Sequence, residues 1–245
     1  SLCAIAACEQ APSATDPYTT PPPEESAEPT ENEPTAATPT DSAETSPEAE
    51  PEATAPATAP EPKPVPSLPE GCTNPETQTM MNTCAQAEYE QADVKLNNAY
   101  QSVKASVNAQ KADQLITAEQ AWLTFRDSYC DFVQSQFAGG SLQPTIYYTC
   151  MTQLTNDRTA VLQQTASSGG SFESADQALN TVYQDLQGGL SADEQAQLTD
   201  AQLAWLDYRD AHCAFEGGAT DACMAQVTSI RVEQLQQQIE NNAPL

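Results

Sequence analysis

The sequence predicts an all-α protein with two tandem three-helix modules, each closed by a disulfide, after a long disordered N-terminal linker. Three observations lead to this fold class. The C-terminal part of the 245-residue chain repeats itself, apolar residues in both copies recur at helical spacing, and a proline-rich, acidic composition ends near residue 71. Few segments alternate apolar and polar residues as strands do.

The repeat defines the two modules, which we place at residues 72–168 and 171–240. Residues 92–130 align without a gap with residues 175–213, and 16 of the 39 aligned positions are identical. A further block that starts at Cys150 aligns with one that starts at Cys223, after ten extra residues in copy one. The polar and aromatic motif positions that recur are Asp93 and Asp176, Tyr100 and Tyr183, Trp122 and Trp205, Arg126 and Arg209, Asp127 and Asp210, and Arg158 and Arg231.

Each repeated block has the pattern of an amphipathic helix. The apolar residues of the tryptophan block in copy one recur every three or four positions and share one helix face; they are Leu115, Ala118, Trp122, Phe125 and Tyr129. Ser191 and Glu194 form a capping-box pattern, and glycine pairs such as Gly217 and Gly218 indicate helix ends. We therefore expect three helices per copy, in which the first two pack as an antiparallel pair and the third follows a glycine-containing loop.

The repeat also selects one disulfide pairing among the 15 that six cysteines allow. Copy two contains only Cys213 and Cys223, which are expected to pair with each other, and equivalence then pairs Cys130 with Cys150. Cys72 and Cys84 remain and would close an N-terminal loop that copy two lacks. Zinc ligands usually come in closer pairs, so no metal site is predicted.

The first eight residues resemble the end of a bacterial lipoprotein signal. Ile5 is followed by two alanines and Cys8, as in a lipobox, and Cys8 would then carry the lipid and begin the mature protein. The alternative is a cysteine-containing remnant of an ordinary secretory signal. Either interpretation places the protein outside the cytoplasm, where disulfides persist.

Residues 9–71 are predicted to be a disordered linker between the lipid and the folded part. They contain 16 of the 19 prolines and 14 acidic residues, against one basic residue, Lys63. Such a segment buries too little apolar surface to offset the entropy that folding costs.

The charge of the chain excludes several classes of partner. The formal net charge is −27, and residues 72–245 contribute −14 of it, from seven basic and 21 acidic residues. A basic patch for nucleic acid or for an anionic bilayer is therefore not expected. No apolar run approaches the roughly 20 residues of a transmembrane helix, so the predicted membrane contact is the lipid anchor alone.

The four arginines all occupy repeated positions, which indicates a structural role. We expect Arg126 or Arg158 to pair with Asp93 or Asp127, and the equivalent residues to pair within copy two. The favoured interpretation is a clamp inside the scaffold, and the alternative is ligand binding.

No catalytic site is predicted, and the chain is expected not to be an enzyme and to need no cofactor. His212 is the only histidine, its counterpart in copy one is Tyr129, and no nucleophile motif accompanies it. We therefore interpret His212 as an ordinary surface residue.

The cysteine, tryptophan and arginine motifs together resemble one known family. Cys72 and Cys84, then the block from Trp122 to Cys130, and Cys150 followed by Arg158 look like the LprI N-terminal domain, whose family is named for a mycobacterial lysozyme-inhibitor lipoprotein. Residues 173–238 look like a shorter second copy. The resemblance implies a small helical, disulfide-bonded domain of the cell envelope, anchored by lipid to the outer membrane or in the periplasm if the source is diderm.

The resemblance also implies a function, namely that the protein binds and inhibits lysozyme. Lysozyme or another cationic envelope protein would be attracted by the acidic charge. The candidate element for entering the sugar cleft of lysozyme is the copy-one insertion, residues 137–148, although it could equally be a plain connection between helices. The alternative function is an envelope module that binds another protein or a glycan and does not affect lysozyme.

Overall fold

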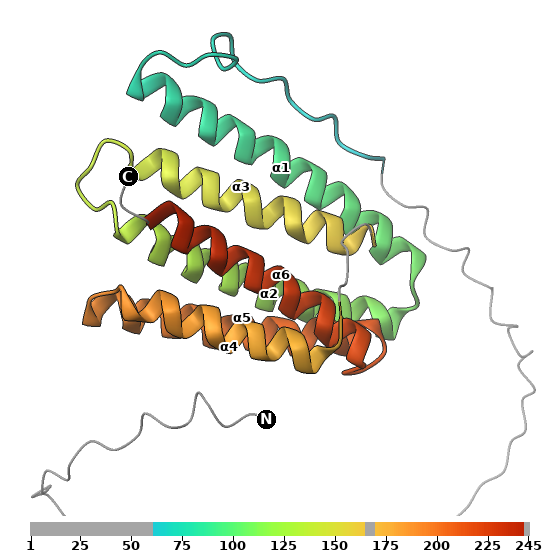
Figure 1. The fold of residues 1–245 in the computed structure, drawn as a ribbon. Helices are drawn as coiled ribbons and strands as arrows, with labels where there is room; N and C mark the ends of the chain where they lie inside the picture. Colours follow the sequence, from blue (N-terminus) through green and yellow to red (C-terminus); the bar gives the residue numbers. More distant parts are fainter. Residues whose placement is uncertain (1–60, 165–169, 243–245) are drawn as a thin grey trace, which may run out of the picture. The chain divides into compact units, whose positions relative to one another are not determined.

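Six helices make up the folded part of the chain (Figure 1). The structure is a computed structural model that describes residues 61–164 and 170–242. The helices are α1 (Gln78–Ser106), α2 (Ala109–Ser135), α3 (Gln143–Leu162), α4 (Phe172–Gly188), α5 (Ala192–Glu216) and α6 (Asp221–Asn242). These two ranges contain no strand, so the all-α class with three helices per copy is confirmed.

Most helices begin at a residue whose side chain accepts a hydrogen bond from the first turn. Thr77, Asn108 and Ser171 cap α1, α2 and α4 in this way. The predicted capping box of α5 is present, because Ser191 and Glu194 each bond to the other's backbone N–H. At the end of α5, Gly217 has a φ of +123°, a backbone conformation that glycine adopts without steric cost.

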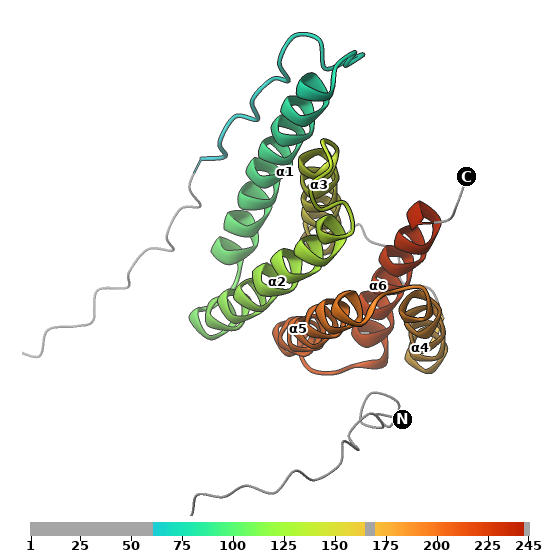
Figure 2. The same ribbon diagram turned by 90° about the vertical axis from the view of Figure 1, so that its left-hand side faces the viewer.

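The helices of each module are arranged around the third one. In the first module α3 packs on α1 and, less extensively, on α2, and in the second module α6 packs mainly on α4 (Figure 2). The expected antiparallel packing of the first two helices is wrong, because α1 and α2 diverge from their short connection and make few contacts. The apolar face of α2 is instead covered by the other module.

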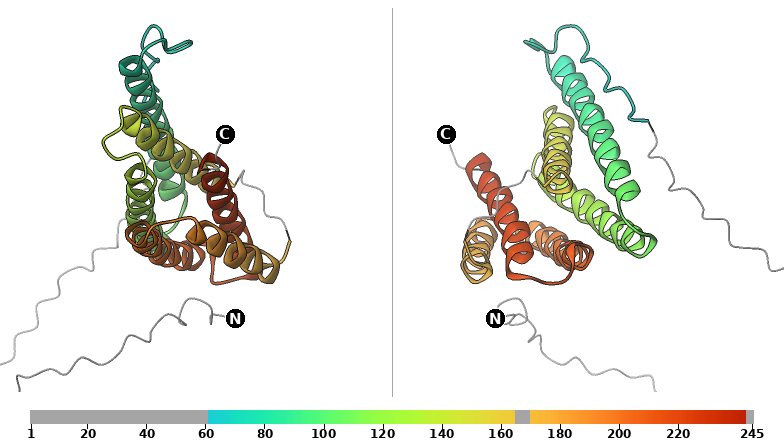
Figure 3. Two further views of the ribbon diagram at one scale, coloured as in Figure 1. Left: turned by 60° about the vertical axis from the view of Figure 1, so that its left-hand side comes forward. Right: turned by 90° about the vertical axis from the view of Figure 1, so that its right-hand side faces the viewer.

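The junction between α2 and α5 is the most extensive helix contact in the described residues (Figure 3). Phe125 and Tyr208 occupy equivalent positions in the two copies, and their rings stack on each other with centroids 6.0 Å apart and planes at 3°. Contact between equivalent residues means that a pseudo-two-fold axis relates the modules at this point. Buried residues of both modules accordingly form one hydrophobic cluster, with Trp122 and Trp205 in it. The module boundaries near residue 170 remain predictions.

Three disulfides join the cysteine pairs that the repeat predicts. Cys130–Cys150 ties the end of α2 to α3, Cys213–Cys223 does the same for α5 and α6, and Cys72–Cys84 fastens the segment before α1 to that helix. The two repeated bridges thus hold each third helix close to the junction helix of its own module.

The end of the predicted linker is extended and lies along α1. The side-chain amide of Asn98 accepts from the backbone N–H of Lys63 at 2.8 Å and donates to its carbonyl at 2.9 Å. Nearer the start of α1, the side chain of Gln91 donates to the backbone carbonyl of Pro66 at 2.7 Å. Residues 61–71 have no helix or strand, but these hydrogen bonds hold them against α1, so this end of the predicted linker is ordered. The predicted lipobox with Cys8, and the linker up to residue 60, lie outside the described residues.

None of the six helices combines the length and the apolar character that crossing a bilayer would require, within the part of the chain that the structure describes.

We predict that replacing Cys130 and Cys150 together by alanine lowers the free energy of unfolding by about 3 kcal/mol. The bridge spans 20 residues, and closing a loop of that length removes entropy from the unfolded chain. Urea unfolding followed by circular dichroism measures the difference between the two proteins. A loss below about 1 kcal/mol would show that the packing of α3 does not depend on this bridge.

Candidate functional site

The four repeated arginines form two pairs with different surroundings. Arg126 binds the neighbouring Asp127 at 2.7 Å, and Arg209 binds Asp210 at the same distance. Each guanidinium also lies over a tryptophan of its own helix, at 5.1 Å from the ring centroid of Trp122 in copy one. These pairs lie at the edge of the core, with the aspartates largely exposed, so they stabilise the helix surface modestly.

Arg158 and Arg231 are fully buried instead, and each crosses the junction into the other module. Arg158, on α3, is held by Glu119 of its own module at 2.9 and 3.0 Å. It also donates at 3.2 Å to the Tyr208 hydroxyl and contacts Nδ1 of His212 at 3.2 Å, both on α5. The first module is thereby fastened to the second by a charge-assisted network.

The equivalent arginine of copy two has no carboxylate partner in the part of the chain that the structure describes. Arg231 donates to the Gln202 amide at 3.0 Å and lies 4.1 Å from the ring centroid of Tyr129, on α2 of the first module. Its Nη2 makes no hydrogen bond within the described residues. Burial lowers the pKa of Arg231 to about 10, opposed by Tyr129. Gln202 stands where copy one has Glu119, so Arg158 binds a carboxylate and Arg231 binds a neutral amide.

The interpretation of His212 as a surface residue is wrong. Its side chain is 1% exposed, because it faces the junction at the position that Tyr129 occupies in copy one. Burial, reinforced by Arg158, lowers its pKa from 6.5 to about 3, so the imidazole is neutral at physiological pH. The Arg158 N–H therefore donates to Nδ1, and the histidine is a packing and acceptor group.

The buried network leaves no space for a ligand. The cavity on the pseudo-two-fold axis, between Trp122 and Trp205, has a volume of about 10 Å³, which is at most one water molecule. Burial raises the pKa of Asp157 beside it, and Gln234 donates to that carboxyl at 2.9 Å. The repeated motif residues at the junction thus hold the modules together.

The remaining motif residues make local contacts on their own helices. Asp93 accepts from Asn97 at 3.0 Å rather than from an arginine, and Asp176 accepts from Asn180 in the same way. Tyr183 contacts the Thr199 hydroxyl at 3.1 Å, whereas the ring of Tyr100 lies beside Lys104. Of the alternatives that the sequence left open, the structure therefore has Arg126 paired with Asp127, and Arg209 paired with Asp210 in copy two.

Sequence reasoning missed Glu119 and Gln202, the partners of the buried arginines. The signal was available, because both residues occupy one aligned column among apolar positions of the tryptophan block. A polar residue on such a face requires a buried partner, and the only long cations at repeated positions were the arginines.

A partly exposed surface with three tyrosines and three aspartates lies where α1, α2 and α3 meet. We call this the tyrosine face; its residues are Tyr89, Tyr147, Tyr148, Asp93, Asp127 and Asp131. The rings of Tyr89 and Tyr148 are 6.0 Å apart. Burial raises the pKa of Tyr89, which Arg126 opposes and the aspartates reinforce, so these charges surround the rings. Copy two has Phe172 in place of Tyr89 and no counterpart of the α3 tyrosines.

The insertion in copy one contributes as much to helix as to loop. Only the residues up to Leu142 form turns, and residues 143–148 are the first residues of α3, with Tyr148 packed toward α1. The loop that the sequence predicts to enter the sugar cleft of lysozyme is therefore shorter than residues 137–148. At its tip Gly139 has a φ of +77°, and the Leu142 side chain beside it is 45% exposed.

Comparisons with known proteins identify relatives of both copies. A family model described as lysozyme inhibitor LprI matches residues 71–162 and again residues 163–235. An uncharacterised protein of Rhizobium meliloti (strain 1021) is 31% identical over 106 residues, which cover 38% of this chain and 76% of the relative. A crystal structure of an uncharacterised Burkholderia thailandensis protein superposes with a TM-score of 0.54 at 16% identity, covering 69% of this chain and 93% of that one. The last likeness concerns the fold alone.

We predict that exchanging the two polar partners changes stability in opposite directions. Glu119→Gln removes the carboxylate from buried Arg158 and should lower the free energy of unfolding by about 1–2 kcal/mol at pH 7. Gln202→Glu gives Arg231 a carboxylate and should raise it by a similar amount. The gain should vanish as the pH falls below about 4, where the introduced carboxyl becomes protonated. Urea unfolding of both variants and of the double exchange measures this; destabilisation by both single variants would contradict it.

We predict that His212 makes the fold less stable as the pH falls from 6.5 toward 3. In this range the unfolded chain binds a proton at His212 and the folded chain does not, since its pKa is about 3. The free energy of unfolding should fall by about 1 kcal/mol per pH unit between pH 6 and 4 relative to His212→Gln. Comparison with the variant cancels the contributions of other titrating groups. One of these is Asp157, whose raised pKa makes the fold more stable as the pH falls. Parallel pH profiles of the two proteins would be the contrary result.

Proposed function

Because both of its copies match the family model, the chain belongs to the lysozyme inhibitor LprI family, and from this premise we propose that it binds and inhibits lysozyme. The family is one of inhibitors rather than enzymes. The single observation that carries the proposal is the match over residues 71–162 and 163–235. Binding would be non-catalytic and would need no cofactor.

The charge of the folded part supports a cationic partner. Residues 72–245 carry −14, and the tyrosine face adds aromatic rings among three aspartates. Opposite charge accelerates the encounter of two proteins, and tyrosines supply contact area at low entropic cost. Lysozymes that are strongly cationic fit such a surface.

The loop between α2 and α3 is the proposed element that enters the sugar cleft of lysozyme. It carries Gly139, exposed Leu142 and no charged side chain between residues 136 and 142. A neutral tip suits a cleft whose walls include carboxylates, because an acidic tip would be repelled. The tyrosine face adjoins the start of α3, so both surfaces could contact one partner.

The proposed location is the cell envelope, with Cys8 as the lipid attachment site and the predicted linker, up to the segment 61–71 that lies along α1, as the tether. The composition of the tether and the three disulfides of the fold support an extracytoplasmic place. Intact-mass measurement of the protein from its native membrane tests the anchor, since absence of added acyl mass would reject it.

We predict that the full chain inhibits lysozyme turnover of cell-wall substrate at micromolar concentration. Leu142→Asp should weaken inhibition at least tenfold, because it places a charge at the proposed tip. Leu203→Asp is the matched control, since this leucine on α5 is exposed to a similar degree, and it should leave inhibition unchanged. Full lysozyme activity at a large excess of the chain would reject the proposed function and leave an envelope interaction module with another partner.

A second pair of variants tests the tyrosine face. Asp93→Asn should lower the rate of association with lysozyme by a few-fold and make that rate less dependent on salt. Asp176→Asn, at the equivalent site of copy two, should change neither. Association rates at two salt concentrations provide the measurement. Equal effects of the two variants would mean that only the total charge matters.

A further inference from the structure

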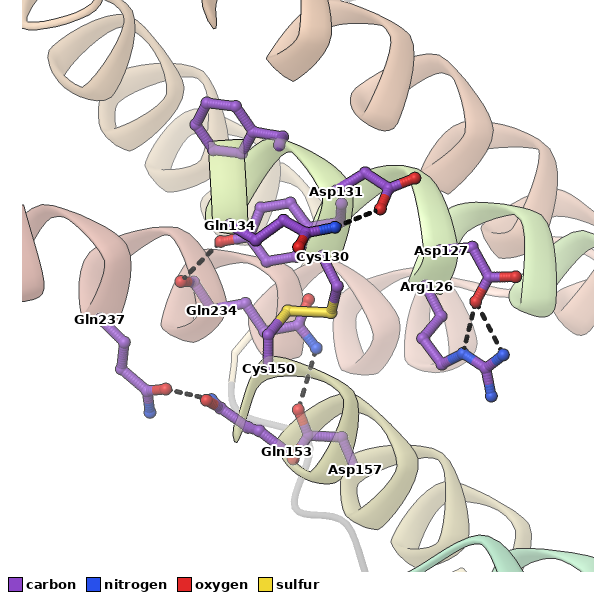
Figure 4. Close-up of a disulfide and its surroundings, with 12 residues drawn as sticks. Arg126, Asp127, Cys130, Asp131, Gln134, Cys150, Gln153, Asp157, Gln234 and Gln237 are labelled. Atoms are coloured by element: carbon purple, nitrogen blue, oxygen red, sulfur yellow. Dashed lines mark hydrogen bonds and ion pairs between the residues drawn. A yellow bond between two sulfur atoms is a disulfide. The ribbon is translucent and has the colours of Figure 1, made fainter. Parts of the chain in front are cut away.

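A groove at the junction of the modules has features that the scaffold does not require. It lies between α2, α3 and the last turns of α6, beside the Cys130–Cys150 disulfide (Figure 4). Its volume is about 70 Å³, enough for several water-sized groups. The lining residues are Tyr129, Val133, Ile146, Thr149, Cys150, Gln153, Leu154, Gln234, Gln237, Gln238 and Asn241, and none of them is charged.

Two of the places where the copies differ in length meet at this groove. α3 begins seven residues before Cys150, whereas α6 begins only two residues before Cys223, so the insertion extends α3 and supplies Ile146. At the other end α3 stops at Leu162, whereas α6 continues seven residues past the equivalent Leu235. That extension supplies Gln237 and Asn241. Both additions to the symmetric scaffold therefore build the same groove.

The chemistry of the lining is that of an amide-binding site. Val133, Ile146 and Leu154 provide an apolar surface. Figure 4 shows Gln153 and Gln237 pointing toward each other, and Nε2 of Gln153 donates to Oε1 of Gln237. This bond leaves the Gln153 oxygen as an acceptor and the Gln237 nitrogen as a donor. An acetamido group carries the complementary N–H, carbonyl and methyl.

We infer that this groove binds the acetamido group of an N-acetylglucosamine residue in a glycan. A neutral ligand fits because the groove contains no cation that would attract an anion and no carboxylate that would attract a cation. The volume accommodates the four heavy atoms of the acetamido group while the sugar ring stays at the surface. This site is separate from the proposed lysozyme contact, and the inference does not rest on it.

The experiment titrates the full chain, without lysozyme, with chitotriose and with cellotriose, which differs by a hydroxyl in place of each acetamido group. Side-chain amide signals in ¹⁵N NMR spectra should shift saturably with chitotriose and not with cellotriose. Chitobiose and N-acetylglucosaminyl-N-acetylmuramic acid then distinguish a chitin-type source from a wall glycan, and saturable binding of either supports the site.

Two variants locate the binding. Gln237→Ala should weaken chitotriose binding at least tenfold, and Gln236→Ala, the exposed neighbour that does not line the groove, should change it less than twofold. Both positions are exposed, so both variants should fold, which circular dichroism verifies. No saturable binding, an equal response to cellotriose, or an equal effect of the two variants would overturn the inference.

Discussion

The contact between α2 and α5 is the constraint on which the rest of the structure depends. Neither tryptophan helix has enough apolar partners within its own module, since α1 diverges from α2 and the third helix covers only part of the face. Each module therefore completes its core with the other one. Phe125 and Tyr208 stack at the centre, and two buried arginines cross from opposite sides. Burying cations is costly unless they are paired, so the junction depends on the groups that receive them.

The two copies show how a symmetric scaffold can diverge without losing its packing. The residues that make the junction are repeated almost unchanged, but their polar partners are not: Glu119 has become Gln202, and Tyr129 corresponds to His212. One crossing arginine is consequently held by charge and the other by amides and aromatic rings. Arg158 has acceptors at all three of its nitrogens, whereas Arg231 makes two hydrogen bonds and packs its guanidinium against the rings of Phe125 and Tyr129.

The distinctive surface features of the fold lie where the two copies differ from each other. The tyrosine face, the exposed loop leucine and the amide-lined groove all involve the copy-one insertion between α2 and α3 or the C-terminal extension of α6. The repeated arginines stabilise helices and the junction, as the repeat predicts, and the repeated Asp93 and Asp127 bind side chains of their own helices while they also border the tyrosine face. The additions that only one copy has therefore supply most of the proposed binding surfaces, because most of the repeated motif residues hold the modules together.

The sequence by itself determined the helices, the disulfide pairs and the family, because these depend on local spacing and on the comparison of two aligned copies. It also paired Arg126 with Asp127, which are neighbours in the chain. Only the tertiary structure decided that α2 packs on α5, that His212 is buried, and that Glu119 is the partner of Arg158. Periodicity shows that a helix has an apolar face and does not show what covers it. Here the cover comes from the other copy, through contacts between residues that lie from 50 to 105 positions apart in the chain.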